Sequence, residues 1–107
     1  MEPWYKIDKK LKSGEYSTED LFNYLSHDND GVLYNTLSVI AENKIQDILL
    51  IEKITKIATG KDIALTKGLP GVTIKFVAIA TLRELGTTEY FDLLNDEEKN
   101  IVLGAFS

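Results

Sequence analysis

The segment from His27 to Gly31, His-Asp-Asn-Asp-Gly, contains side chains that commonly bind metal ions. A calcium loop in this register would need an acidic or amide side chain at Ser26 and a glutamate at Leu37, and the sequence has neither. His27 is the only histidine, and a zinc site would need further ligands close to it. Because Asp, Asn and Gly also favour turns and helix N-caps, the segment predicts a capping turn and no metal site.

The other patterns that could support catalysis are incomplete. The chain has no cysteine, which excludes thiolate nucleophiles, thiolate metal ligands and disulfides. No nucleophile motif accompanies a Ser-His-Asp arrangement built on the single histidine. Gly60-Lys61 lacks the earlier glycine and the following Ser or Thr of a phosphate-binding loop. Glu97 and Glu98 are adjacent in sequence and therefore point apart on a helix. We predict that the protein is not an enzyme and has no cofactor.

Acidic residues are concentrated in two segments that contain no lysine or arginine. Residues 13–43 contain six acids, and residues 84–98 contain six more. Residues 1–12 and 44–83 are net basic, with charges of +2 and +4, while the whole chain has a net charge of −5. This distribution predicts a negative field that steers a basic partner.

Eight residues in or beside these acidic segments are the candidate partner-binding residues. If helix hairpins stack, six acids are expected to lie on one edge: Asp28, Asp30, Glu42, Glu84, Glu89 and Asp92. Tyr34 and Tyr90 lie beside them in the sequence, and tyrosine is favoured as an interface anchor. An alternative interpretation is that the acids favour helix N-termini and that both tyrosines are half-buried core residues with solvated hydroxyls.

Nucleic acid and membrane are not the expected partners. Affinity for phosphates comes chiefly from Lys and Arg, and residues 44–83 contain a single arginine and dispersed lysines. The longest apolar runs, residues 48–51 and 76–80, are far shorter than the roughly 18 to 20 residues that span a bilayer. The N-terminus lacks the features of a signal peptide, and the absence of cysteine suits a reducing compartment. We therefore expect a cytoplasmic protein.

Helical periodicity covers most of the chain, and no strand pattern competes with it. The first predicted helix covers about 3–12 and ends before Gly14, and the second covers 18–26 and is capped by Ser17. A third helix starts at 28–31 and is interrupted at 42–44, and a fourth covers 45–58 and ends before Gly60. The next helix covers 72–85 and ends before Gly86, a short helix runs from Thr87 or Thr88 to Leu94, and a last one runs from Asn95 or Asp96 to Phe106. Residues 61–71 are expected to form the longest connection. The helix at 72–85 is apolar on most sides and is expected to be central. The aromatic residues expected in the core are Trp4, Phe22, Phe76, Phe91 and Phe106.

A shift of 42 residues aligns two parts of the chain. It pairs Val32 with Ile74, Tyr34 with Phe76, Leu37 with Ile79, Ile40 with Leu82, and Glu42 with Glu84. Mismatches such as Leu33 over Lys75 occur, and any two amphipathic helices match in part, so the alignment leaves open whether the two segments are a true repeat. The period falls in the range of two-helix solenoid repeats.

Residues 74–87, Ile-Lys-Phe-Val-Ala-Ile-Ala-Thr-Leu-Arg-Glu-Leu-Gly-Thr, resemble the first helix and turn of a HEAT-like repeat, in which small residues alternate with larger ones before a Leu-Gly ending. They depart from the family at Thr87 and Thr88, where Asp-Pro is common. The resemblance implies an all-α fold, a compact stack of antiparallel helix hairpins with about six or seven helices. We expect residues 1–107 to form one domain, with hairpin repeats possible at about 30–60 and 72–106.

In size and style the chain is also similar to small bacterial toxin-immunity proteins, which are single-domain cytosolic inhibitors. This resemblance implies a non-catalytic protein that occludes a basic toxin, for example a nuclease, with its acidic edge. The alternative is a structural or adaptor domain that dimerises or docks into a larger assembly through an apolar helix face.

Overall fold

The computed structural model of the chain describes residues 3–27, 29–59 and 74–106. These residues form seven α-helices and no strand, which confirms the predicted all-α fold. In chain order the helices are α1 (Trp4–Ser13), α2 (Thr18–Tyr24), α3 (Asp30–Asn43), α4 (Ile48–Thr59), α5 (Ile74–Glu84), α6 (Glu89–Asp92) and α7 (Asp96–Leu103). The longest has 14 residues, and no helix in these ranges is long and apolar enough to cross a lipid bilayer.

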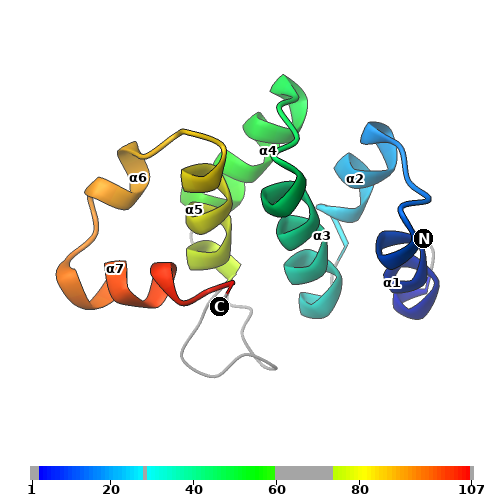
Figure 1. Cartoon of the computed structure of the whole chain (residues 1–107), viewed down its shortest axis with the longest axis horizontal. Helices are drawn as coiled ribbons and strands as arrows, with labels where there is room; N and C mark the ends of the chain where they lie inside the picture. Colours follow the sequence, from blue (N-terminus) through cyan, green and yellow to red (C-terminus); the bar gives the residue numbers. More distant parts are fainter. Residues whose placement is uncertain (1–2, 28, 60–73, 107) are drawn as a thin grey trace.

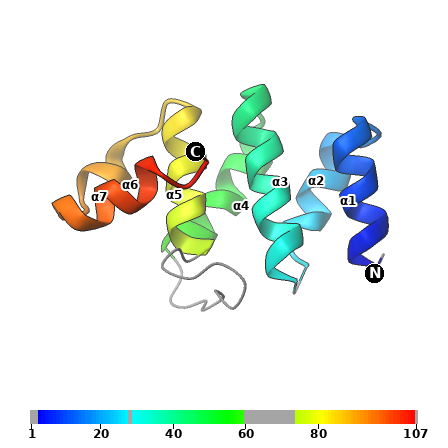
Figure 2. The same ribbon diagram turned by 60° about the horizontal axis from the view of Figure 1, so that its bottom comes forward.

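The helices are arranged in two layers (Figures 1 and 2). In one layer α3 packs between α1 and α5, and in the other α2 packs against α4. Contacts of α2 with α3 and of α4 with α5 join the two layers. The remaining side of α5 is covered by α6 and α7. The described residues therefore form a compact stack of antiparallel helix hairpins, as predicted.

Two predicted N-caps form reciprocal hydrogen bonds with the third residue of their helix. Ser17 Oγ accepts from the N–H of Asp20 at 3.1 Å, and a carboxylate oxygen of Asp20 accepts from the N–H of Ser17 at 2.9 Å. Asn95 and Glu98 form the same arrangement at 2.8 and 3.1 Å. Each pair satisfies two backbone donors that the helix leaves free, which fixes where α2 and α7 begin.

The fourth helix begins later than its apolar stripe. The stripe predicts a start at Ile45, whereas α4 starts at Ile48. Asp47 explains the difference, because its Oδ1 accepts from the N–H groups of Leu49 at 3.0 Å and Leu50 at 3.1 Å and so caps the helix. Ile45 remains packed against the core from within the turn.

The turns after α1, α3 and α5 each contain one residue with a left-handed backbone. These residues are Gly14 with φ 78°, Lys44 with φ 48° and Gly86 with φ 97°. The predicted helix ends at Gly14 and Gly86 are confirmed, while the predicted end at Gly60 and the connection 61–71 lie outside the described residues. Lys44 and Gly86 are separated by the 42 residues of the sequence alignment, so the chain reverses at equivalent points after α3 and α5.

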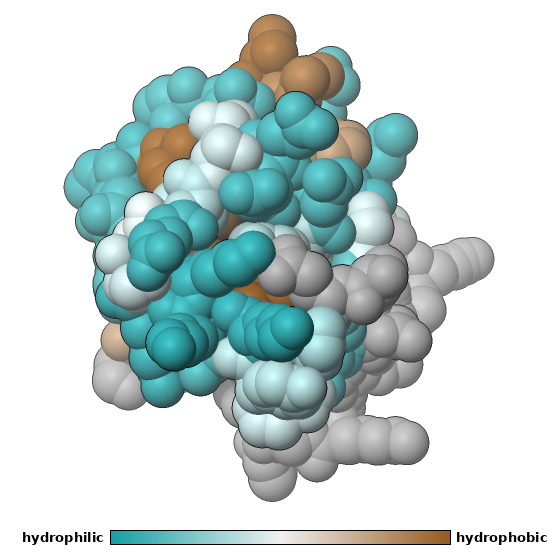
Figure 3. Space-filling view, turned by 90° about the vertical axis from the view of Figure 1, so that its right-hand side faces the viewer, coloured by the Kyte–Doolittle hydropathy of each residue, from teal (hydrophilic) through white to brown (hydrophobic). Residues whose placement is uncertain are grey.

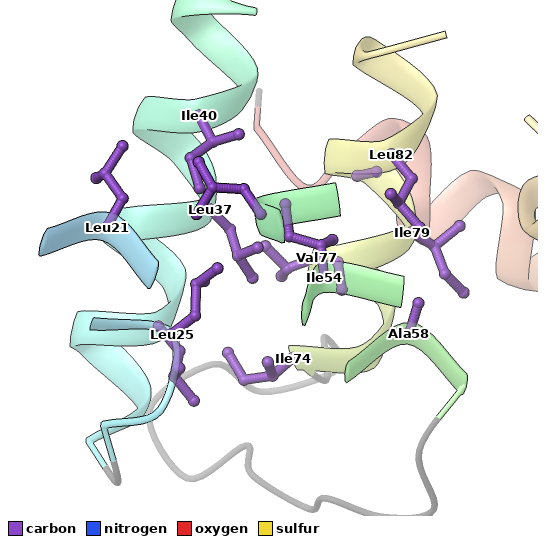
Figure 4. Packing of buried hydrophobic residues seen from close by; sticks show 14 of the residues in the cluster. Leu21, Leu25, Leu37, Ile40, Ile54, Ala58, Ile74, Val77, Ile79 and Leu82 are labelled. Carbon is purple, nitrogen blue, oxygen red and sulfur yellow. The ribbon is translucent and has the colours of Figure 1, made fainter. Parts of the chain in front are cut away.

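The fifth helix is central to the core, as its composition predicts. Ile74 and the unbroken stretch 77–82 are buried. Figure 4 shows side chains of α5 meeting apolar side chains from neighbouring helices, including Leu37 of α3 and Ile54 of α4. The helices packed around α5 thus bury apolar side chains against it, in agreement with its place in the middle of the core.

Two aromatic residues expected in the core lie at the surface. Trp4 is 56% exposed and Phe22 is 37% exposed, whereas Phe76, Phe91 and Phe106 are half-buried against the core. The core face of α1 consists of Ile7 and Leu11. Trp4 lies in the first turn of the first helix and contacts the ring of Tyr5 edge-on at 5.8 Å, so the prediction of core positions was wrong for Trp4 and Phe22.

Candidate protein-binding site

In the polar turn before α3, the side chains of His27 and Asn29 accept hydrogen bonds from backbone N–H groups of the same chain. Asn29 Oδ1 accepts from the N–H of Val32 at 3.1 Å, which confirms the predicted cap. His27 Nδ1 accepts from the N–H of Asn29 at 3.1 Å. Asp28 lies outside the described residues. Across the part of the chain that the structure describes, no group of three or more His, Cys, Asp or Glu side chains could hold a metal ion.

Two of the predicted site acids lie at the same end of the helical stack. Glu42 is exposed near the end of α3, and Glu84 is the last residue of α5. Lys44 Nζ lies 3.5 Å from Glu84 Oε1 and donates to the backbone carbonyl of Glu84 at 3.4 Å. Arg83 also approaches the Glu84 carboxylate, at 3.7 Å. The charge of Glu84 is therefore partly compensated, and Lys44 joins the turns after α3 and α5.

The prediction that all six acids lie on one edge was wrong for Asp30. Asp30 begins α3 and Glu42 lies 12 residues later, which separates their backbones by about 18 Å along the helix. Because the end of α3 lies beside the end of α5, Asp30 is at the opposite end of the layer from Glu84 (Figure 1). Acids that share a sequence segment are thus divided between the two ends of one helix.

The largest group of neighbouring carboxylates lies on α6 and the first turn of α7. We call this group, Glu89, Asp92, Asp96 and Glu97, the C-terminal acidic surface. All four side chains are exposed, and none has a cationic partner within ion-pair distance among the described residues. Residues 89–103 contain five acids and one lysine, a net charge of −4. Glu89 and Asp92 are among the candidate residues predicted from the sequence, whereas Asp96 and Glu97 are not, although all four belong to the same lysine-free segment.

The C-terminal acidic surface is held in place by an aromatic side chain between two cations. The guanidinium of Arg83 lies 5.0 Å from the centre of the Phe91 ring, and Lys99 Nζ lies 5.6 Å from it. These distances are those of cation–π contacts. Phe91 therefore ties α6 to both α5 and α7. Leu93, which follows α6 directly, is 82% exposed and places an apolar side chain next to the acids.

The two predicted anchor tyrosines are half-buried rather than projecting. Tyr34 donates a hydrogen bond of 2.7 Å from its hydroxyl to the carbonyl oxygen of Ala105, and its ring lies 6.1 Å from that of Phe106. Tyr90 packs against the core from α6. The hydroxyl of Tyr34 thus joins α3 to the C-terminal segment, in agreement with the alternative interpretation of a half-buried tyrosine.

A polar groove between α1 and α3 was not predicted from the sequence. It has a volume of about 450 Å³ and is lined by side chains that include Tyr16, Ser38 and Glu42. Asn35 Nδ2 donates to Asp8 Oδ1 at 2.8 Å and bridges the two helices. Only the tertiary packing of α1 on α3 brings the two sides of the groove together, because they lie at least 19 positions apart in the chain.

The C-terminal acidic surface groups charges on two neighbouring short helices. Its acids are positioned by short helices, the Asn95–Glu98 cap and the contacts of Phe91. Such a surface can attract and orient a cationic partner without any change of covalent bonds. No family model matches this chain, and neither does any curated protein or solved structure.

Proposed function

We propose that this domain is a non-catalytic protein that binds a basic protein through the C-terminal acidic surface, and that it acts in the cytoplasm as an immunity protein that occludes a basic toxin. The observation that supports the proposal most directly is the group of four exposed carboxylates without cationic partners among the described residues. The exposed side chain of Leu93 supplies an apolar contact within the same surface.

Electrostatic steering by this surface depends on how closely its charges are grouped. At physiological ionic strength the screening length is about 8 Å, so charges on neighbouring turns reinforce one another while charges across the molecule do not. The longest dimension of the protein is 37 Å. Arg83 and Lys99 lie at this end against Phe91, but the five acids of residues 89–103 outnumber these two cations, so a basic protein should be attracted to this end.

A rigid acidic surface also lowers the entropic cost of binding. Ordering mobile side chains and loops on association costs about 0.5–1.5 kcal/mol for each rotamer-rich side chain. The Asn95–Glu98 cap and the contacts of Arg83 and Lys99 with the Phe91 ring already order the backbone that carries the four acids, so that association has only their exposed side chains to order. More of the interaction energy is thus retained as affinity.

A nuclease is a suitable class of basic toxin for such a surface. Proteins that bind nucleic acid attract phosphates with Lys and Arg. An acidic domain that covers those residues would compete directly with the substrate and would inhibit the enzyme by occlusion. The acids would at the same time repel free nucleic acid.

The proposal can be tested by co-expression with the protein encoded by the adjacent gene, since an immunity protein is expected beside its toxin. Expression of the neighbour alone should arrest growth of the host, and co-expression of this chain should restore it. Glu89→Lys/Asp92→Lys should rescue growth poorly while keeping a helical circular dichroism spectrum. Glu19→Lys/Glu52→Lys changes the net charge equally at exposed positions on α2 and α4 and should rescue fully. Equal rescue by both variants, or a neighbour that does not impair growth, would contradict the proposal.

A second candidate function, docking into a larger assembly, rests on two exposed apolar side chains at the start of α4. Ile48 and Leu49 are 73% and 59% exposed. Aspartate is well tolerated in the first turn of a helix, so Ile48→Asp/Leu49→Asp should remain folded. If the domain is an adaptor, this variant should lose its partner in a pull-down while Glu89→Lys/Asp92→Lys retains it. The immunity proposal predicts the reverse.

A further inference from the structure

The outer flank of α1 is a positively charged surface that the stack leaves uncovered. Lys6, Lys9 and Lys10 line one shallow depression of about 410 Å³ together with Glu15. Ile7 and Leu11 face the core, so the lysines lie on the sides of α1 that turn away from it. Figure 3 looks onto this end of the molecule and shows a predominantly hydrophilic surface.

The charge of α1 is predominantly positive. The helix contains four lysines and one aspartate, a net charge of +3. Asp8 is engaged by Lys12 at 3.2 Å and by the side chain of Asn35. Neither Lys6 nor Lys9 has a carboxylate within ion-pair distance among the described residues. Trp4 and Tyr5, each 56% exposed, add apolar surface on the same helix.

The C-terminal acidic surface lies at the other end of the long axis (Figure 1). The protein extends 37 Å along this axis, several times the screening length of about 8 Å at physiological ionic strength. The two ends therefore present opposite charges to the solvent independently of each other. The negative end also exposes Leu93, so each end combines charge with an apolar side chain.

We infer that the α1 flank docks onto the C-terminal acidic surface of a second copy of this chain. The occupant follows from charge complementarity, because a net charge of +3 on α1 meets a net charge of −4 on residues 89–103. The contact joins two different surfaces, so it is heterologous. An open chain of copies keeps one free end of each sign, so it grows head to tail or closes into a ring when the two ends meet. A heterologous contact of this kind does not form a two-fold symmetric dimer.

This inference goes beyond the proposed function and does not depend on it. The same acidic surface would serve both interactions, so a basic partner should dissociate the chains of copies. If self-association fails, binding to a basic protein can still be tested by the growth assay. If the neighbouring protein proves harmless, self-association can still be measured on the purified chain.

The experiment is sedimentation velocity of the purified protein over increasing concentration, at ionic strengths of about 0.15 M and about 1 M, where the screening lengths are about 8 Å and about 3 Å. The wild type should associate at low ionic strength and be monomeric at high ionic strength. Lys6→Glu/Lys9→Glu and Glu89→Lys/Asp92→Lys should each weaken association about tenfold or more, since the first changes the charge of α1 from +3 to −1 and the second changes that of residues 89–103 from −4 to 0.

A charge swap gives the decisive comparison. With Asp96→Lys added to these four substitutions, the charge becomes −1 on α1 and +2 on residues 89–103, so this five-substitution variant should associate again, whereas each pair alone should not. Lys53→Glu/Lys56→Glu on α4 has the same spacing as the α1 pair and should associate like the wild type. A wild type that is monomeric at every concentration, a five-substitution variant that fails to recover, or an equal loss in the α4 control would overturn the inference.

Discussion

Replacing Ile79 with alanine should lower the free energy of unfolding by about 3–4 kcal/mol. Ile79 is 2% exposed on α5, which packs against α3, α4, α6 and α7. The substitution removes three carbon atoms, worth about 2.4 kcal/mol at about 0.8 kcal/mol for each buried methylene. Helices on several sides prevent the site from collapsing, so a residual cavity should add about 1 kcal/mol. Natural domains have about 5–15 kcal/mol of stability, so the variant should still fold.

The matched control is Ile48→Ala, which removes the same atoms from a side chain that is 73% exposed. Its free energy of unfolding should stay within about 0.5 kcal/mol of the wild type. Urea denaturation followed by circular dichroism measures the free energy of unfolding of both variants, provided that its slope against urea concentration is the same as in the wild type. A loss below about 1 kcal/mol for Ile79→Ala, or an equal loss in the two variants, would refute the assignment of α5 as the central helix.

Three further predictions concern buried polar groups and the turn after α3. Thr36 and Thr81 are both fully buried, but Thr81 Oγ1 donates to the carbonyl of Val77 at 2.9 Å while Thr36 Oγ1 has no hydrogen-bond partner among the described residues. In thermal denaturation Thr36→Val should therefore stabilise the fold by about 1 kcal/mol, and Thr81→Val should not. Tyr34→Phe removes a hydrogen bond of 2.7 Å to the C-terminal segment and should cost about 1 kcal/mol, with faster amide exchange in the last residues as the readout and unchanged exchange as the contrary result. Lys44 has a left-handed backbone at φ 48°, which glycine adopts without strain, so Lys44→Gly should raise the free energy of unfolding by about 0.5–1 kcal/mol in urea denaturation. Lys44→Ala should lower the free energy of unfolding. The opposite order of stability would show that the side-chain contacts of this lysine outweigh the backbone strain.

Features that depend on neighbouring residues could be predicted from the sequence. The caps at Ser17 and Asn95 involve a side chain and a backbone group three residues apart, so the residue types alone indicate them. The central position of α5 follows from its composition, because a helix that is apolar on most sides must be covered on most sides. Gly14 and Gly86 mark helix ends for a comparable local reason, since glycine adopts a left-handed backbone without steric cost.

Features that depend on tertiary packing could not be predicted in this way. Periodicity places Trp4 on a helix, but whether another element covers it depends on its position at the end of the stack. The separation of Asp30 from Glu84 depends on the direction of α3 relative to α5. The hydrogen bond from Tyr34 to Ala105 joins residues 71 positions apart. In each case the residue types are compatible with several arrangements of the helices, and only the tertiary packing determines which one forms.

The association rate with the partner is the most direct test of the central claim that the C-terminal acidic surface recognises a basic protein. After a pull-down identifies the partner, stopped-flow mixing at low and high ionic strength would compare the wild type, Glu89→Lys/Asp92→Lys and the control Glu19→Lys/Glu52→Lys. We predict that only Glu89→Lys/Asp92→Lys associates much more slowly than the wild type and that its association rate loses most of its dependence on salt, because fixed charges act mainly on the encounter rate. A rate that is unchanged by reversal of Glu89 and Asp92, or a captured partner that is acidic, would contradict the claim.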